Sequence, residues 1–398
     1  MSGALTRIPV SIVAAMAMRI GSGVSAGADS RVAAIEAATD ARQRLDGAPV
    51  DLAMVFSSGS HLADPQATLD GVLEALDPAA LIGCASAAVL SCGQDYEGRS
   101  AVTVWAASAP DADLETFHLR TSETADGSLR LVGLPDPARI GATVLLPQPG
   151  PFPVQAALDA LTATAPGRPV LGGIASGLSP EGLPILFHAD QVLSDGAVGV
   201  TLDGVDVLPC VSQGVAAVGP PLEVTGVENG IILTIDGRPA LESLRRVIDG
   251  LTGYERATRG GGLLLGVSHA SEPGHDYLVQ GPLQVDHRVG SVAITTAVRE
   301  GAFVQLHRRD ARAAASDLRE QLALRSEALG GSPAGALLFT CNGRGSRFFG
   351  SPHSDAAAIE ETLGGIATAG FFAAGEIGPI AGANLVHEFT ATAAVFAS

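Results

Sequence analysis

Runs of apolar residues alternate with segments of helical period in a pattern that recurs three times along the chain. Each copy consists of a strand, a helix, a second strand with an internal glycine, a loop and a final strand. Apolar runs of strand length between helices are typical of α/β layers with largely buried sheets. The copies span residues 51–108, 142–202 and 335–397, with helices expected over 64–77, 153–164 and 355–364.

The second strand of each copy contains glycine. These strands read ALIGCAS (80–86), PVLGGIAS (169–176) and IATAGFFAAGE (366–376), and their glycines are Gly83, Gly172 with Gly173, and Gly370. Glycine inside a strand often marks the close approach of a ligand or of another backbone. The sequence therefore predicts an α/β (or α+β) fold with two related subdomains, in which repeated strand–helix–strand units build mixed β-sheets.

Between the second and third copies, the pattern changes. Segment 219–250 reads as a strand, a tight turn at Asn229-Gly230, a second strand and a helix that starts at Pro239. Strand-like runs follow as far as Asp310, which is suited to cap a helix over 311–325. The seam between domains is expected near 250–260. We predict an N-terminal tail over 1–18, an N-terminal domain over 19–250 and a C-terminal domain over 251–398.

Charge and composition exclude several classes of function. The 398 residues carry a formal charge of −18, with a mean hydropathy of +0.31, which indicates a globular protein. All 24 basic residues are arginine, so lysine Schiff-base enzymes and the P-loop signature are excluded. The acidic balance argues against nucleic acid as a partner. No apolar run approaches the roughly 20 residues that a membrane span needs.

The cysteines and the first residues bear on location. The four cysteines lie far apart without CxxC spacing, which fits reduced thiols in the cytoplasm better than disulfides or a zinc site. Residues 1–18 faintly resemble a signal peptide, but their apolar stretch is short and broken. We therefore expect a cytoplasmic protein with an N-terminal tail or an upstream start, and export remains the alternative.

The candidate chemistry begins in a loop near the C-terminus. An apolar strand over 335–341 runs into a glycine-rich loop that consists of Cys341, Asn342, Gly343, Arg344 and Gly345. Such a loop presents backbone N–H groups to an anion, and arginine can hold a carboxylate through two hydrogen bonds. The structural alternative is an Asn-Gly turn in which the arginine pairs with a neighbouring acid.

Glu376 follows an almost uncharged run, so its carboxylate is either buried and paired or lines a cavity. Arg344 for a carboxylate and Glu376 for an ammonium group would suit an amino acid, whereas a pair between them would be structural. Asn384 and His387 could complete a polar lining. The glycine-rich strands add Gly83, Cys84 and Gly173 to the predicted ligand site.

Two other kinds of chemistry stay open. Cys341 and His387 could form a nucleophile and its base in a cysteine-dependent enzyme, although buried cysteines are usually small hydrophobic residues. The nine histidines show no HxH or HExxH pattern, but a haem needs only one axial histidine. We predict no resident cofactor, with haem as the alternative, and a scaffold without a ligand is a further possibility.

Several motifs resemble the F-box and intracellular signal transduction (FIST) family over about residues 50–395. In the N-terminal part they are Leu81-Ile82-Gly83-Cys84-Ala85-Ser86, Glu97, Gln213-Gly214, Gly219-Pro220-Pro221, Val224-Thr225 and Asp236-Gly237-Arg238-Pro239-Ala240. In the C-terminal part they are Tyr277-Leu278-Val279, Val285-Asp286, Arg299-Glu300-Gly301, Val304-Gln305, Arg309-Asp310 and the two loops that contain Arg344 and Glu376.

This resemblance implies an intracellular sensory module that binds a small ligand such as an amino acid. Some bacterial members of the family are described as haem-dependent nitric oxide sensors, which keeps the haem alternative open. The residues before the module show no F-box-like helical pattern, so a role in ubiquitin ligase assembly is not carried over. No kinase, cyclase or DNA-binding element is recognised, so the output would pass through a separate signalling partner.

Overall fold

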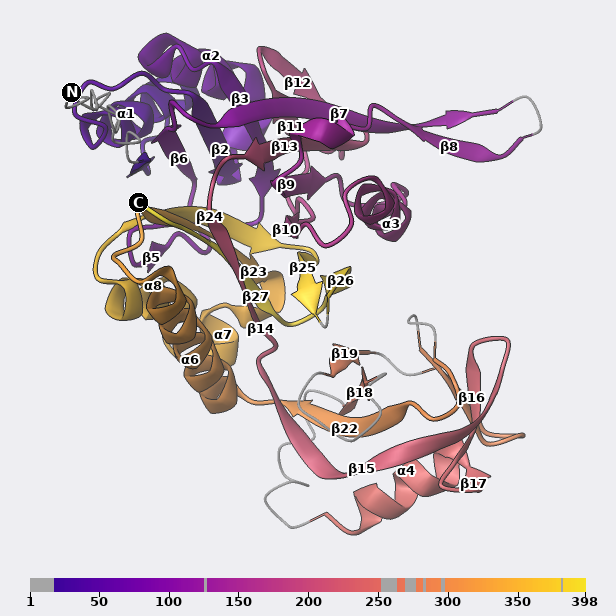
Figure 1. The fold of residues 1–398 in the computed structure, drawn as a ribbon. Helices are drawn as coiled ribbons and strands as arrows, with labels where there is room; N and C mark the ends of the chain where they lie inside the picture. Colours follow the sequence, from indigo (N-terminus) through magenta and orange to yellow (C-terminus); the bar gives the residue numbers. More distant parts are fainter. Residues whose placement is uncertain are drawn as a thin grey trace, which may run out of the picture.

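The computed structural model of the protein describes residues 18–124, 127–251, 263–268, 277–281, 284–294, 298–380 and 382–398. In these parts of the chain, three sheets and the helices on them form a body from residues 18–212 and 311–398 (Figure 1). The described residues between 215 and 309 form a separate lobe around a fourth sheet, and we call this lobe the inserted domain. Residues 1–17 of the predicted N-terminal tail lie outside the described residues.

The three sheets of the body share one order of strands. An edge strand pairs with the last strand of a repeat unit, and then come the first strand, the second strand and a hairpin. The first sheet contains β1 (Arg19–Ser25), β6 (Ala101–Ser108), β2 (Leu52–Ser58), β3 (Ala80–Ser86), β11 (Leu186–His188) and β12 (Gln191–Leu193). The second contains β7 (Asp113–Glu123), β13 (Ala197–Asp203), β9 (Ala142–Pro147), β10 (Val170–Gly173), β25 (Glu376–Ile380) and β26 (Ala383–His387), with β8 (Leu129–Val132) beyond β7. The third contains β14 (Val207–Ser212), β27 (Ala391–Phe396), β23 (Gly335–Cys341), β24 (Ala367–Ala373), β4 (Val89–Ser91) and β5 (Gln94–Asp95).

The predicted strand–helix–strand units are confirmed. In each unit, the first and second strands pair in parallel and the third strand pairs antiparallel with the first. The connecting helices are α2 (Pro65–Leu76), α3 (Val154–Thr164) and α8 (Ser354–Leu363). The other helical segments of the body are α1 (Ser30–Gln43), α6 (Ala311–Leu329), α7 (Ser346–Phe349) and the short 3-10 turns η1 (Gly59–Ala63), η2 (Pro137–Arg139) and η4 (Asn342–Arg344).

The glycine of each second strand serves close contact between two backbones. A Cβ atom at Gly83, Gly172 or Gly370 would overlap the carbonyl oxygen of the residue opposite it on the first strand, whereas one at Gly173 would meet side chains. The three pairs are Val55 with Gly83, Leu145 with Gly172 and Leu338 with Gly370. The sequence allowed either a ligand or another backbone to approach these strand glycines, and in the structure it is the backbone of the neighbouring strand that does so.

A hairpin follows the second strand of each unit and completes the sheet of a different unit. The β4–β5 hairpin pairs with β24, the β11–β12 hairpin pairs with β3, and the β25–β26 hairpin pairs with β10. The exchange is cyclic, because each unit gives one hairpin and receives another. The three sheets meet in one core, where the ring of Phe371 lies 5.0 Å from that of Phe56 and 5.5 Å from that of Phe339.

The inserted domain combines strands from both sides of the predicted boundary at residue 250. Its sheet contains β19 (Leu278–Gln280), β18 (Leu263–Ser268), β22 (Phe303–Arg309), β15 (Val215–Glu228), β16 (Ile231–Ile235), β21 (Ser291–Ala293), β20 (Gln284–Asp286) and β17 (Arg238–Pro239). The turn at Asn229-Gly230 forms as predicted, with φ of 50° and 78°, and α4 (Ala240–Asp249) follows. Of the seam predicted near 250–260, residues 252–260 lie outside the described residues.

Two local predictions need correction or placement. The strand expected over 366–376 is interrupted after Ala373, so Glu376 opens β25 instead of a loop. The reason is that β24 and β25 belong to different sheets, which forces the chain to turn at Gly375. Asp310 caps α6 as predicted, because its carboxylate accepts from the backbone N–H groups of Arg312 and Ala313.

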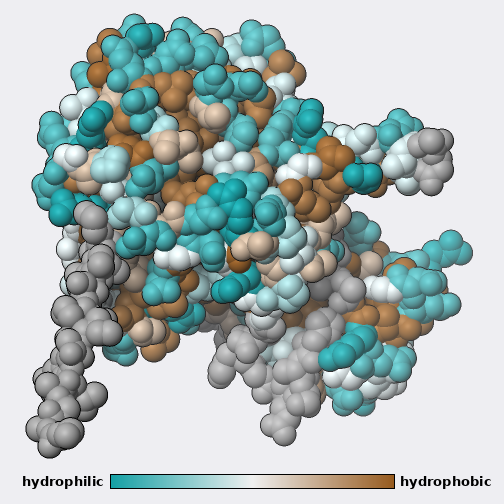
Figure 2. Space-filling view, turned by 45° about the horizontal axis from the view of Figure 1, so that its top comes forward, coloured by the Kyte–Doolittle hydropathy of each residue, from teal (hydrophilic) through white to brown (hydrophobic). Residues whose placement is uncertain are grey.

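The surface of the body is mixed in polarity. On the face shown in Figure 2, hydrophilic residues predominate and apolar residues lie between them in small groups. The β7–β8 hairpin projects from the body in both views. Among the described helices, none has the length and apolar character needed to cross a membrane.

Candidate functional site

The predicted loop around Arg344 is tied down by protein groups. The Arg344 guanidinium donates from Nε and Nη2 to the two carboxylate oxygens of Asp355, each at 2.8 Å, and the residue is only 2% exposed. Thr340 donates to the same carboxylate. Arg344 therefore neither pairs with Glu376 nor presents its two-hydrogen-bond face to a cavity, because α8 brings Asp355 over it.

The anion expected at this loop is supplied by the protein. Glu97 accepts a hydrogen bond of 2.7 Å from the backbone N–H of Ser346, and its carboxylate lies over Gly345. Asn342 is exposed, and the N–H of Gly343 donates to the sulfur of Cys341 at 3.4 Å. The loop is thus an anion-binding turn that an internal carboxylate occupies.

Glu376 is fully buried beside Cys341. Its Oε2 accepts from the N–H and the hydroxyl of Thr390 at 3.0 and 2.8 Å, and the Cys341 thiol lies within reach of the same carboxyl group. Burial raises the pKa of Glu376 to about 8. Burial, followed by the Glu376 carboxylate, raises the pKa of Cys341 to about 12. The thiol is therefore protonated at neutral pH, which is unfavourable for a nucleophile.

The remaining predicted residues are dispersed. Asn384 connects β26 to the α3 region, since it donates to Thr162 and to the Arg168 carbonyl and accepts from the N–H of Val170. Nε2 of His387 lies 2.8 Å from the Gly378 carbonyl, and burial lowers the pKa of His387 to about 4. No hydrogen bond joins His387 to Cys341 among the described residues.

Gly83, Cys84 and Gly173 lie in the core of the body. Cys84 is fully buried, and a Cβ at Gly173 would lie 2.8 Å from that of Ala373 and 3.2 Å from the ring of Phe371. The residues predicted to line one ligand site therefore do not converge on one cavity.

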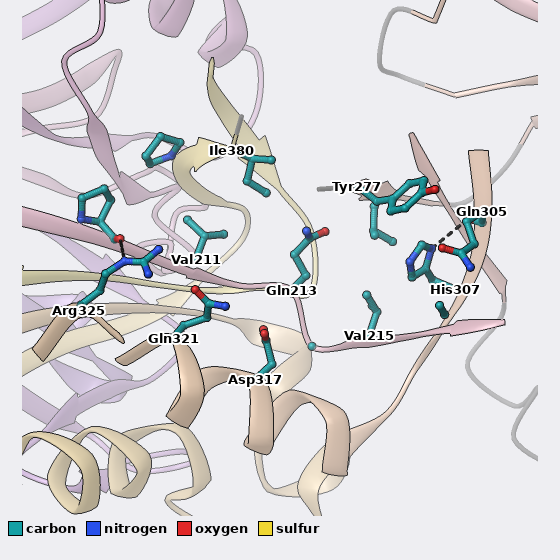
Figure 3. A pocket seen from close by; sticks show the side chains of 15 residues that line it. Val211, Gln213, Val215, Tyr277, Gln305, His307, Asp317, Gln321, Arg325 and Ile380 are labelled. Carbon is teal, nitrogen blue, oxygen red and sulfur yellow. Dashed lines mark hydrogen bonds between the residues drawn. The ribbon is translucent and has the colours of Figure 1, made fainter. Parts of the chain in front are cut away.

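A cleft of about 510 Å³ lies between the body and the inserted domain, and we call it the hinge cleft (Figure 3). The body contributes β14, β25 and α6, and the inserted domain contributes β15, β19 and β22. Its lining consists of Pro209, Val211, Gln213, Gly214, Val215, Ala217, Tyr277, Val279, Gln305, His307, Asp317, Gln321, Arg325, Pro379 and Ile380.

The polar lining leaves groups available to a ligand. The hydroxyl of Tyr277 has no hydrogen-bond partner in the described parts of the chain, but it is buried away from the cleft's open space, so Tyr277 contributes its ring to the lining. Nδ1 of His307 lies 3.0 Å from the Gln305 carbonyl, and burial lowers the pKa of His307 below its usual 6.5, so this ring is neutral at pH 7. Arg325 donates from Nε to the Pro209 carbonyl at 2.8 Å, and its terminal nitrogens form no salt bridge within the described residues. Asp317 and Gln321 face the cleft from the same helix.

The strands that join the two lobes run side by side at the end of the cleft. Val215 pairs with Arg309, and the N–H of Asp310 lies 3.5 Å from the Gly214 carbonyl. The Arg309 guanidinium stacks on the ring of Phe389, 3.1 Å from its centroid. Gly214 packs against the buried Arg344 guanidinium. The loop predicted as a ligand site therefore supports the hinge next to the cleft.

Sequence reasoning assigned no role in ligand binding to the cleft residues. Two signals could have identified them. Gln213, Gly214, Tyr277, Val279 and Gln305 all belong to the motifs that carry the family resemblance. Asp317, Gln321 and Arg325 recur at intervals of four, which places them on one face of a helix.

Comparison with known proteins identifies the family. Residues 51–238 match the FIST N domain, and residues 240–379 match the FIST C domain, so the two matches meet at the start of α4. Uncharacterised proteins of Mycobacterium bovis and Mycobacterium tuberculosis are 43% identical to this chain over 383 residues. The similarity covers 95% of this chain and 99% or 100% of those proteins. The chain belongs to the FIST family, whose domains are associated with sensing in signal transduction.

Proposed function

We propose that this protein is a cytoplasmic sensor that binds a small zwitterionic ligand, of the class that includes amino acids, in the hinge cleft. One observation carries the proposal: a cavity of about 510 Å³ is bounded by both lobes and is lined in part by polar side chains, which include Gln213, Asp317 and Gln321. Small-molecule sites are commonly concave, lie between domains and have volumes of about 300–1,000 Å³. The cleft has all three properties.

The position of the cleft supports a signalling mechanism. A ligand that contacts Gln321 on the body and Tyr277 on the inserted domain binds more tightly when the two lobes are close together. Such differential affinity is what shifts a conformational equilibrium. The closed arrangement then presents a different surface to a separate protein partner. At a hundredfold excess over Kd, binding also stabilises the fold by about 2.7 kcal/mol.

The thiols support the proposed location. Cys84, Cys92, Cys210 and Cys341 are all free, as expected in a reducing compartment. The same thiols weigh against the cysteine-dependent enzyme, because Cys341 lies beside a carboxyl group that opposes its ionisation.

The test is a thermal-shift screen of amino acids and other small zwitterions on two variants. Ala217 is exposed on β15 inside the cleft, so Ala217→Trp fills the cavity without entering the core. Ala156 is exposed on α3 outside the cleft lining, so Ala156→Trp is the matched control. We expect a ligand that raises the Tm of the wild type and of Ala156→Trp, but not of Ala217→Trp. Equal shifts in all three proteins would place the ligand elsewhere.

A further inference from the structure

Two opposite charges face the hinge cleft from one side of α6. Asp317 and Arg325 are eight residues apart, and Gln321 lies midway between them. Residues four apart on a helix share a face, so the three side chains form one row. Figure 3 shows them in that order along α6, with the amide between the two charges.

Neither charge is neutralised by an ion pair among the described residues. The salt bridges of the described chain include neither Asp317 nor Arg325, although both side chains are only partly exposed. Elsewhere on the same helix, Arg319 pairs with Glu361 at 2.8 Å. Both charges therefore remain available to a ligand that enters the cleft and displaces the water around them.

The geometry of α6 separates the two charges. Eight residues at a rise of 1.5 Å span about 12 Å. Arginine on a helix could lean toward its N-terminus and so approach Asp317, but the hydrogen bond from Nε to the Pro209 carbonyl holds Arg325 at β14. The Arg325 end of the row is therefore held away from Asp317.

We propose that the ligand of the hinge cleft is an elongated zwitterion, a peptide of two or three residues or an ω-amino acid, rather than a free α-amino acid. Its ammonium group binds Asp317 and its carboxylate binds Arg325. If the charged groups keep the spacing of their positions on the helix, allowing about 2.8 Å for each terminal hydrogen bond leaves about 6 Å between the ligand's charges. An extended peptide gains about 3.5 Å per residue, so two or three residues cover this distance.

The amides of the lining complete the recognition. Gln321 on α6 and Gln213 on the hinge both face the cleft and can each donate to and accept from a peptide group. The ammonium and carboxylate of a free α-amino acid are attached to one carbon, so it can reach only one end of the row. This inference rests on the proposed function, since it specifies the ligand of the same cleft.

The test is isothermal titration calorimetry of the full chain with two series of probes. One series is glycine, diglycine, triglycine and tetraglycine, and the other is ω-amino acids of increasing length up to 8-aminooctanoate. We expect binding to be undetectable for glycine and strongest at an intermediate length in both series. Asp317→Asn and Arg325→Gln should each weaken the best probe by about tenfold or more, because each removes a charge-assisted hydrogen bond.

N-acetylation of the best peptide removes its ammonium group and completes a double-mutant cycle. Acetylation should weaken binding to the wild type but have little further effect on Asp317→Asn. The matched control is Glu320→Gln, which removes an exposed carboxylate on α6 outside the cleft lining and should leave binding unchanged.

The results separate this inference from the proposed function. If free α-amino acids bind more tightly than the peptides, or acetylation does not weaken binding to the wild type, the inference is wrong and the cleft remains a small-ligand site. If no zwitterion or singly charged probe of any length binds the wild type, the proposed function itself fails.

Discussion

Gly214 lies directly against the guanidinium of Arg344, so the strand that enters the inserted domain rests on a buried ion pair. Gly214 has a φ of 63°, and a Cβ atom there would overlap Nη1 of Arg344 and crowd the Phe389 carbonyl. Arg344 is held in turn by Asp355 at the start of α8. The geometry of the hinge is therefore set by side chains of the body.

Gly214→Ala should destabilise the protein more than alanine at a comparable glycine. Gly237 has a similar φ of 71° but no atom within 4 Å of its added Cβ. Gly237→Ala should cost about 1 kcal/mol for the left-handed backbone, and Gly214→Ala about 1–3 kcal/mol more for the overlap. Urea unfolding of the two variants measures the difference. Equal losses would show that Arg344 moves aside freely.

Arg344→Leu should lower the free energy of unfolding by about 3–5 kcal/mol, because it leaves the Asp355 carboxylate buried without its cation. Arg246 forms an exposed pair with Glu242, so Arg246→Leu should change stability by under about 1 kcal/mol. The double variant Arg344→Leu with Asp355→Leu should recover part of the loss. Chemical denaturation tests all three, and a small loss in Arg344→Leu would mean that water reaches Asp355.

Glu376 should make stability fall as pH rises. Its pKa is raised from 4.5 to about 8 in the folded protein, so within that window the native state holds a proton that the unfolded chain has lost. The stabilisation is complete below pH 4.5 and is lost as pH rises through about 8, with a slope of up to about 1.4 kcal/mol per pH unit.

Glu376→Gln should flatten this profile, because glutamine stays neutral and can still accept from Thr390. Glu327 is exposed on α6, and Glu327→Gln should retain the wild-type slope. Urea unfolding across the pH window measures both variants. Parallel profiles for Glu376→Gln and the wild type would indicate that Glu376 is already ionised when folded.

Cys92 should react first among the four thiols. It is partly exposed, whereas Cys84, Cys210 and Cys341 are buried, and burial raises the pKa of each of these three. Thiolate is the nucleophilic form, so alkylation of the buried thiols at neutral pH should wait for unfolding. Mass spectrometry after brief iodoacetamide treatment identifies the labelled residue. Rapid and selective labelling of Cys341 would instead revive the enzyme hypothesis.

Gly83→Ala should disrupt the first sheet. The added Cβ overlaps the backbone carbonyl of Val55, and a backbone atom within a sheet cannot turn away as a side chain can. We expect a loss of about 1–3 kcal/mol or more. Gly331 has no atom within 4 Å of its added Cβ, so Gly331→Ala is the control and should be close to neutral. Thermal unfolding compares them, and equal Tm values would mean that the sheet adjusts.

The repeat units could be predicted because their pattern is local. A strand, a helix and a glycine-containing strand lie within about forty residues, and Gly83, Gly172 and Gly370 follow from the need for close backbone contact. The partner of a short strand such as β4 is not local. Val89–Ser91 pairs with β24, almost three hundred residues later, and no feature of three apolar residues specifies that pairing.

The candidate site was harder to predict for the same reason. Many acidic residues in the sequence could have paired with Arg344. Asp355 is its partner because α8 packs next to the loop that contains Arg344. The charges of Asp317 and Arg325 look like an ordinary solvated helix face until β14 and the inserted domain are placed beside them. The ligand site was predicted around single charged residues in apolar segments, Arg344 and Glu376. The hinge cleft is instead formed by residues from several distant segments.

The cyclic exchange of hairpins also dictates when the chain can fold during synthesis. The outer edge of β3 stays unpaired until residues 186–193 have been made, and the β4–β5 hairpin of the first unit has no partner strand until residues 367–373 leave the ribosome. Contacts between such distant segments slow folding and expose unpaired strand edges meanwhile. A chain that stops before β24 should therefore be captured by chaperones or degraded, and no single unit is expected to survive as a separate domain.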